Sequence, residues 1–161
     1  MCEIHLITGG TGAGKTTYAR TLALETGAIR FSIDEWMSVL FWMDSPDPIR
    51  FDWVMTRINR VETQMWDTAR HILSTGTPVI FDLGFTKQAH REKFRTLAAS
   101  VNRPSILHWV DVDANERWHR VQGRNAEKGE AFVMTVTSEM FKFMESEWET
   151  PETEPHKKIK T

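Results

Sequence analysis

The chain has 161 residues and a net charge of −2, with 40% hydrophobic and 26% charged residues, which is the composition of one globular domain. Its single cysteine, Cys2, excludes an internal disulfide, and we expect a reducing compartment, the cytoplasm. The N-terminal residues lack the pattern of a signal peptide, and no apolar run approaches the roughly 18 residues of a membrane span.

The charge is unevenly distributed, because basic side chains outnumber acidic ones over residues 87–124 and acidic side chains outnumber basic ones over residues 125–155. A protein that grips long nucleic acid usually has a stronger overall basic excess. The distribution therefore favours a small anionic ligand, and no membrane partner is expected.

Strand-like runs alternate with helical runs along the chain, a pattern typical of a parallel sheet with helices on both faces. The expected strands are residues 3–8, 30–33, 78–82 and 105–112. The expected helices are residues 15–26, 36–75 with a break at the prolines of 44–48, 87–100, 114–125 and 131–149. We predict one α/β domain over residues 1–150, with four or five parallel strands and four as the first choice. Residues 151–161 have few apolar groups and are expected to form a flexible tail.

The most informative segment is residues 9–16, GGTGAGKT, which matches the phosphate-binding pattern G-x-x-x-x-G-K-[ST]. Its glycines allow consecutive backbone N–H groups to curve around phosphate oxygens, and the helix that follows points its positive end at the same anion. The pattern predicts ATP and Mg²⁺ as cofactors, with Lys15 at the β- and γ-phosphates and Thr16 as a metal ligand. The residues expected to bind ATP here are Gly10, Thr11, Gly12, Ala13, Gly14, Lys15, Thr16 and Thr17.

With this loop, the chain resembles the small P-loop kinases that include zeta-toxin-like proteins, chloramphenicol phosphotransferase and the kinase domain of polynucleotide 5′-hydroxyl kinases. The resemblance covers residues 3–147. It implies an AAA-type ATP-binding domain with the three-layer, nucleotide-kinase-like fold of P-loop NTPases. It also implies a helical acceptor pocket over residues 36–75 and a lid over residues 114–130.

The run FSID at 31–34 is the first further point of resemblance. It implies that Asp34 accepts the proton of the acceptor hydroxyl as a general base. The alternative interpretation is that Asp34 caps the helix beginning at Glu35. Polynucleotide kinases usually have an arginine shortly after this aspartate, and this chain has Glu-Trp-Met instead, which counts against a nucleic-acid 5′ end as acceptor.

Asp82 closes the apolar run 79–82 and is similar to the Walker B aspartate, which orders the water shell of Mg²⁺ or pairs with Thr16. A plain strand-ending aspartate at a turn is the alternative. Many relatives carry Asp-x-Thr-Asn here and an arginine a few residues later. This chain has Asp-Leu-Gly-Phe, followed by Arg91, and the departure suggests a different contact with the acceptor.

Arg117, Arg120 and Arg124 fall in the expected lid. Arg120 and Arg124 have the R-x-x-x-R spacing of the resembling kinases and share one helix face. The resemblance implies that both are catalytic cations at the transferring phosphoryl group, with Arg120 also contacting the nucleotide. The alternative is a solvated basic helix face.

The segment 36–75 is rich in tryptophan and arginine. Its tryptophans are Trp36, Trp42, Trp53 and Trp66, of which most are expected in the core and Trp36, close to Asp34, in the pocket. Its arginines Arg50, Arg57 and Arg60 are candidates for binding an acceptor phosphate, and the sequence does not choose among them.

These features predict an ATP-dependent kinase that transfers the γ-phosphoryl group to a hydroxyl. The predicted catalytic residues are Lys15, Asp34, Arg120 and Arg124, and the predicted metal ligands are Thr16 and Asp82. The acceptor is left open among sugar nucleotides, antibiotics, nucleosides and nucleic-acid 5′ ends. The alternatives are a P-loop ATPase or nucleotide switch that acts through a partner, and a kinase-type toxin held by an antitoxin. A homodimer also remains open.

Overall fold

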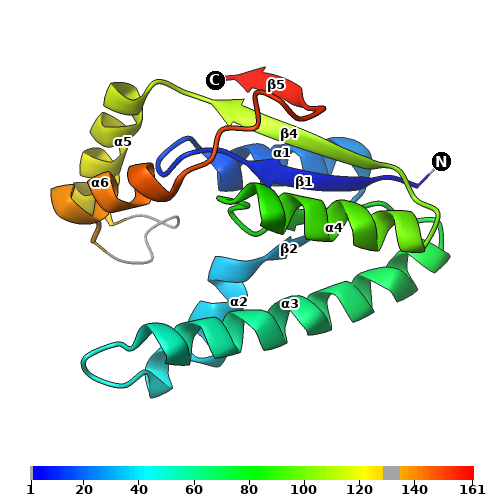
Figure 1. The fold of residues 1–161 in the computed structure, drawn as a ribbon, viewed down its shortest axis with the longest axis horizontal. Coiled ribbons are helices and arrows are strands. Elements are labelled where there is room, and N and C mark those ends of the chain that lie inside the picture. Colours follow the sequence, from blue (N-terminus) through cyan, green and yellow to red (C-terminus); the bar gives the residue numbers. More distant parts are fainter. Residues whose placement is uncertain (1, 129–134) are drawn as a thin grey trace.

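A computed structural model describes residues 2–128 and 135–161, which form a five-stranded parallel sheet with helices on both faces (Figure 1). The strands are β1 (Ile4–Thr8), β2 (Ile29–Ser32), β3 (Val79–Asp82), β4 (Ser105–Asp111) and β5 (Lys157–Lys160). Their order across the sheet is β2-β3-β1-β4-β5, and each neighbouring pair is parallel. The predicted α/β class and parallel sheet are confirmed.

The helices are α1 (Lys15–Thr26), α2 (Ile33–Leu40), the short 3₁₀ helix η1 (Trp42–Asp44), α3 (Phe51–Ser74), α4 (Gln88–Ser100), α5 (Ala114–Glu127) and α6 (Ser138–Glu147). The predicted break at 44–48 separates η1 from α3. Of the predicted helix 131–149, residues 131–134 lie outside the described residues, and α6 begins only after Thr137, whose side chain accepts from Met140 N. Within the described ranges, no helix combines the length and apolarity needed to cross a membrane.

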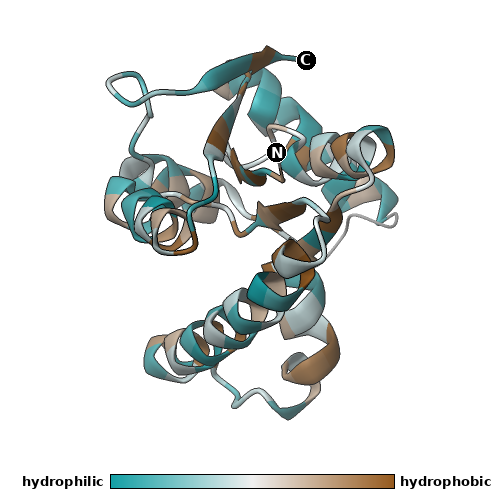
Figure 2. Ribbon diagram, turned by 90° about the vertical axis from the view of Figure 1, so that its right-hand side faces the viewer, coloured by the Kyte–Doolittle hydropathy of each residue, from teal (hydrophilic) through white to brown (hydrophobic). Residues whose placement is uncertain are grey.

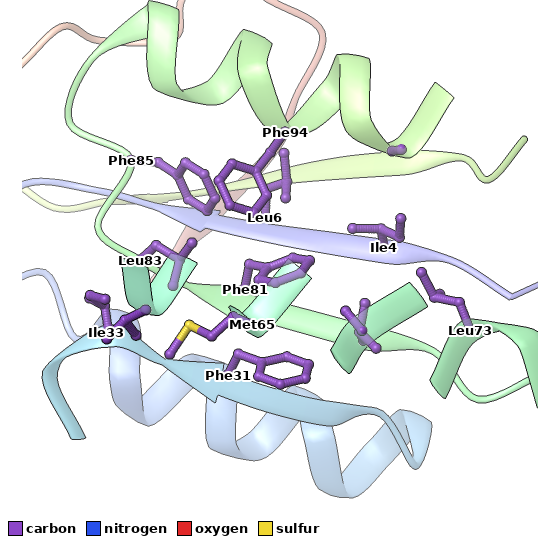
Figure 3. Packing of buried hydrophobic residues seen from close by; sticks show 14 of the residues in the cluster. Ile4, Leu6, Phe31, Ile33, Met65, Leu73, Phe81, Leu83, Phe85 and Phe94 are labelled. Atoms are coloured by element: carbon purple, nitrogen blue, oxygen red, sulfur yellow. The ribbon is translucent and has the colours of Figure 1, made fainter. Parts of the chain in front are cut away.

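The two faces of the sheet bury different apolar clusters. On one face, under α3 and α4, Phe81 packs against Phe94 with ring centroids 4.9 Å apart, and Leu6 and Met65 are fully buried beside them (Figure 3). On the other face, α1 covers a smaller cluster that includes Ile80. Strands buried on both faces are mostly apolar, and Figure 2 shows brown inner strands between helices that carry much teal.

The face under α1 also holds a buried polar chain. His5 Nδ1 lies 3.0 Å from His108 Nε2, and the Tyr18 hydroxyl lies 2.8 Å from His108 Nδ1. Burial, aided by nearby His5 and Lys157, lowers the pKa of His108 to about 4. The imidazole of His108 is therefore neutral at pH 7, which suits a side chain enclosed between strands and a helix.

The expectation of a flexible tail over residues 151–161 is wrong, as is the first choice of four strands. Residues Lys157–Lys160 pair with β4 as the edge strand β5, whose lysines are tolerable because an edge strand faces water. The preceding residues are held by Glu154, which forms a salt bridge with Arg91 at 2.5 Å and another with Arg95 at 2.6 Å. Because Arg91 is fully buried, its charge requires this partner.

Candidate functional site

A cleft of about 1060 Å³ opens at the carboxyl ends of β1, β2 and β3, where ligands of parallel α/β sheets bind. Its walls come from the loop after β1, the first turns of α1 and α2, the loop after β3, and parts of α5 and α6. All residues predicted for catalysis, phosphate binding and metal binding line it: Gly10, Thr11, Gly12, Ala13, Gly14, Lys15, Thr16, Thr17, Asp34, Asp82, Arg120 and Arg124.

The loop after β1 leads into α1 through Gly14, whose φ of 87° lies in the left-handed region that glycine tolerates best. No side chain caps this helix, so the backbone N–H groups of its first turn face the cleft without a side-chain acceptor. Lys15 Nζ donates to the carbonyl oxygens of Gly9 and Gly10, at 2.9 and 3.0 Å. Burial lowers the pKa of Lys15, while the charges of Asp82 and Asp34 oppose that shift.

Arg117 anchors the loop instead of reaching toward a phosphate. Its guanidinium is buried, donates to Thr11 O at 3.2 Å, and pairs with Glu145 of α6 through Nη1 at 2.5 Å and Nη2 at 2.7 Å. A Cβ at Gly10 would lie 2.3 Å from Arg117 Nη1, so only glycine permits this approach. Arg117 thus joins the phosphate-binding loop, α5 and α6 into one unit.

Asp34 lies in the first turn of α2 and lines the cleft. The capping interpretation of Asp34 is wrong, because the N-cap is Ser32, whose hydroxyl accepts from Glu35 N at 3.4 Å. Loss of solvent in the cleft and the nearby charge of Asp82 raise the pKa of Asp34, and Lys15 and Arg124 oppose the shift. A carboxylate with a raised pKa is a better proton acceptor than an ordinary one.

Asp82 ends β3, and Arg30 of β2 holds it in place. Arg30 Nη1 donates to Asp82 Oδ2 at 2.9 Å, and the same guanidinium pairs with Glu35. Arg30 was not predicted from the sequence, because its contact with Asp82 depends on the register of β2 and β3, in which Ser32 lies opposite Asp82 and Arg30 opposite Ile80.

The Thr16 hydroxyl and the Asp82 carboxylate fit Mg²⁺, since both line the cleft and hard oxygen ligands are what this ion prefers. Among the described residues, no group of three or more His, Cys, Asp or Glu side chains could hold a metal. A magnesium ion here would therefore complete its shell with oxygens from phosphate and water, as it usually does in nucleotide sites.

Arg120 and Arg124 of α5 both line the cleft but have different surroundings. Arg120 Nε pairs with Glu116 at 3.0 Å, and its Nη1 lies 3.9 Å from where a Cβ of Gly14 would be. The Nε of Arg124 is buried and has no hydrogen-bond partner within residues 2–128 and 135–161. A buried guanidinium N–H without a partner is costly, which makes Arg124 a candidate for contact with a bound anion.

The loop after β3 is turned by two consecutive left-handed residues, Gly84 with φ 80° and Phe85 with φ 48°. This turn places the Phe85 ring in the core, while its carbonyl accepts from Thr8 Oγ1 at 3.0 Å and from Arg91 Nη1 at 2.8 Å. Arg91 is therefore buried within the protein and does not line the cleft. The unusual Asp-Leu-Gly-Phe run buries its aromatic ring instead of presenting a polar side chain.

The predicted acceptor segment contributes other residues than expected. Trp36, the expected pocket member, does not line the cleft and packs edge-on against Phe31, with ring centroids 5.9 Å apart. Trp42 lines the cleft in its place and stacks on Trp53. None of the three candidate arginines of this segment lines the cleft: Arg50, Arg57 and Arg60.

Residues 4–151 match the AAA domain family, and the chain belongs to that family. No curated protein matches the sequence. Several solved structures share the fold, all at low sequence identity.

One is a protein of Chloroflexus aurantiacus to which kinase activity is ascribed, with a TM-score of 0.76, 17% identity and coverage of 99% of this chain and 88% of that one. Kti12 of Chaetomium thermophilum in complex with ADP-AlF3 has a TM-score of 0.71 and 14% identity, over 98% of this chain and 88% of that one. The APS kinase CysC of Mycobacterium tuberculosis, in complex with AMPPNP and APS, has a TM-score of 0.66 and 18% identity, over 99% and 88%. The chain therefore has the fold of P-loop kinases.

Proposed function

We propose that this protein is an ATP- and Mg²⁺-dependent kinase that transfers the γ-phosphoryl group to the hydroxyl of an acceptor. The observation that carries the proposal is the content of one cleft. The phosphate-binding loop, the proton-accepting carboxylate Asp34 and the unpartnered Nε of Arg124 all line it. The fold of the chain is similar to that of an APS kinase and of Kti12, whose solved structures hold nucleotides, and this similarity supports the proposed kinase function.

In this mechanism the backbone of residues 10–17 and the Lys15 ammonium bind the phosphate chain. Thr16 and Asp82 would hold Mg²⁺, which would offset the charge of the phosphates. Arg30 acts as a positioning residue, because its contact with Asp82 Oδ2 leaves Oδ1 for the metal shell.

Asp34 orients the acceptor hydroxyl and takes its proton. The acceptor oxygen forms a new bond to the γ-phosphorus, and the bond from that phosphorus to the β,γ-bridging oxygen breaks, which leaves ADP. Arg120 and Arg124, in the predicted lid over residues 114–130, stabilise the charge on the transferring group. Residues 129–130 of this lid lie outside the described residues.

The closer relationship to zeta-toxin-like proteins and chloramphenicol phosphotransferase stays a prediction, and so do a cytoplasmic location, an antitoxin and a homodimer. A nucleotide switch or a toxin would use the same phosphate-binding loop. These alternatives differ from the proposed kinase in what happens to the γ-phosphate.

The test is incubation of the protein with γ-labelled ATP, Mg²⁺ and an extract of metabolites and RNA. We expect the label to move to an acceptor with the wild-type protein and not with Lys15→Ala, which removes the cation at the phosphates but should remain folded. Label that appears only as inorganic phosphate would contradict the kinase proposal and favour the nucleotide switch. Thermal unfolding of both proteins checks that the variant is intact.

A further inference from the structure

The cleft has two ends of different character. Beyond Asp34 and Asp82, its walls come from the second turn of α2, the loop after β3 and the C-terminal half of α6. The segment that follows α6 meets the loop after β3 directly, because Glu149 N donates to Thr86 O at 3.0 Å. We call this part the acceptor end, since its lining residues come from α2, the loop after β3 and α6 and not from the phosphate-binding loop.

The acceptor end is mostly apolar. Its apolar side chains are Val39, Trp42, Leu83, Phe143 and Trp148, whereas Met144 Sδ accepts from Thr11 Oγ1 of the phosphate-binding loop at 3.2 Å. Two of them are well exposed, with Val39 at 72% and Phe143 at 67% of their maximum. Exposed apolar side chains on facing walls of a cleft are typical of a site that binds an apolar or aromatic ligand.

No cation of the described residues remains to bind an anionic group on an acceptor. The cations that line the cleft are Lys15, Arg20, Arg120 and Arg124. Three of them are assigned to the transferring phosphates, and Arg20 donates to Glu35 Oε1 at 3.1 Å. Lys87, at the end of the loop after β3, pairs with Glu147 at 3.1 Å and Glu149 at 3.5 Å. The sequence 129–134, GEAFVM, contains no basic residue.

The acidic groups of the cleft add no site for an anion. Glu35 and Glu147 line the cleft and are paired with Arg20, Arg30 and Lys87. Asp34 also lines it, and its carboxylate disfavours an anion close by. An acceptor phosphate, sulfate or carboxylate would lose water without gaining a partner, a cost that an uncharged or amine-bearing alcohol does not meet.

We propose that the acceptor is an alcohol that carries no anionic group and presents an apolar or aromatic face to the cleft. This inference rests on the proposed kinase function, and it separates this protein from kinases that act on phosphorylated or sulfated acceptors. Nucleic-acid 5′ ends, nucleotides, sugar nucleotides and sugar acids are thereby excluded as acceptors. Nucleosides and uncharged antibiotics remain.

The test divides a metabolite extract on an anion-exchange resin at pH 8 into an unbound fraction and a bound, anionic fraction. Each fraction is incubated with the protein, Mg²⁺ and γ-labelled ATP. We expect labelled product from the unbound fraction, at a rate at least tenfold above that from the anionic fraction. Product mainly from the anionic fraction would overturn the inference while leaving the kinase proposal intact. No labelled product from either fraction, with ATP hydrolysed, would overturn both.

A second measurement uses the acceptor recovered from the unbound fraction and the variant Phe143→Ala. Loss of one aromatic wall should raise KM for the acceptor about tenfold, which corresponds to about 1.4 kcal/mol, and leave KM for ATP unchanged. Phe51→Ala is the matched control, because Phe51 is 80% exposed and does not line the cleft. Equal KM values for the acceptor in Phe143→Ala and Phe51→Ala would contradict the proposed apolar contact.

Discussion

The loops that follow β1 and β3 both leave buried strands at the same edge of the sheet, yet they use their polar groups in opposite ways. Residues 14–17, at the end of the loop after β1 and the start of α1, line the cleft with no side chain capping the helix, and the Lys15 ammonium is held there by Gly9 O and Gly10 O. The loop after β3 uses its polar groups internally, since Phe85 O accepts from both Thr8 and Arg91. We infer that changes around the first loop affect chemistry with little loss of stability, and that changes around the second affect stability.

The largest effect on the chemistry is expected from Asp34→Asn. This variant keeps the shape of the side chain but cannot take a proton, so kcat should fall by about 100- to 10,000-fold. Binding of ATP should change little, because Asp34 is proposed to act on the acceptor and not on the nucleotide. Transfer kinetics and calorimetric ATP titrations measure the two quantities.

The control for this prediction is Glu35→Gln, the neighbouring carboxylate on the same helix turn, which is paired with Arg20 and Arg30. It should retain kcat within about threefold. In the wild-type protein the rate should rise with pH through the raised pKa of Asp34, because the base acts in its deprotonated form. Retained transfer in Asp34→Asn would remove Asp34 from the mechanism.

Glu154→Ala tests the second loop. It leaves the fully buried guanidinium of Arg91 without its carboxylate partner, so the free energy of unfolding should fall by about 3–5 kcal/mol. Glu152→Ala, two residues earlier and exposed, is the control and should stay within about 0.5 kcal/mol of wild type. Urea unfolding measures both, and equal stability of the two variants would contradict the role assigned to Glu154.

How far each of these loops could be predicted from the sequence depends on how far apart in the chain its interacting residues lie. The phosphate-binding loop was predictable because its glycines, lysine and helix are contiguous. Asp34 and Asp82 line the same cleft because β2 and β3, which precede them, are parallel and end at the same edge of the sheet. The pairing of Arg91 with Glu154 joins residues 63 positions apart, and no local pattern marks it. The salt bridges of Glu154 with Arg91 and Arg95 also explain why the polar segment before β5 packs against the domain.

The acceptor end was less predictable than the phosphate end. Trp36 and Trp42 have similar sequence surroundings, and only the direction of α2 and η1 decides which of them faces the cleft. Arg30 was hidden because its contact with Asp82 depends on the register of β2 and β3. The phosphate-binding loop could thus be predicted from the sequence, whereas contacts that depend on how the elements pack could not.

Arg124→Ala should lower kcat by about 100-fold while leaving the affinity for ATP within a few-fold, since its charge matters most during transfer. Arg60→Ala, an exposed arginine of α3 outside the cleft, should behave as wild type. Steady-state kinetics on both variants make the comparison. Normal turnover by Arg124→Ala would make α5 a solvated basic helix instead of a lid.

The smallest effect concerns the sheet that carries both loops. The pKa of His108 is about 4 in the folded protein, against 6.5 for an ordinary histidine side chain in water, so the unfolded chain takes up its proton first as the pH falls. Stability should therefore decrease between pH 6.5 and pH 4, by at most about 3 kcal/mol.

His108→Asn removes the titrating group and should flatten the dependence of stability on pH over this range, although its stability at pH 7 should be lower. His71→Asn, at an exposed position of α3, should keep the wild-type slope. Thermal unfolding at several pH values measures the slopes. An unchanged slope in His108→Asn would show that His108 does not titrate as its burial demands.

The central claim is that the loop after β1 binds a nucleoside triphosphate through its backbone and Lys15. Calorimetric titration of Mg·ATP into the wild-type protein and into Lys15→Ala tests it most directly. We expect saturable binding by the wild-type protein and an affinity at least tenfold lower for the folded variant. Absence of binding to the wild-type protein, or equal affinity of the two proteins, would contradict the claim.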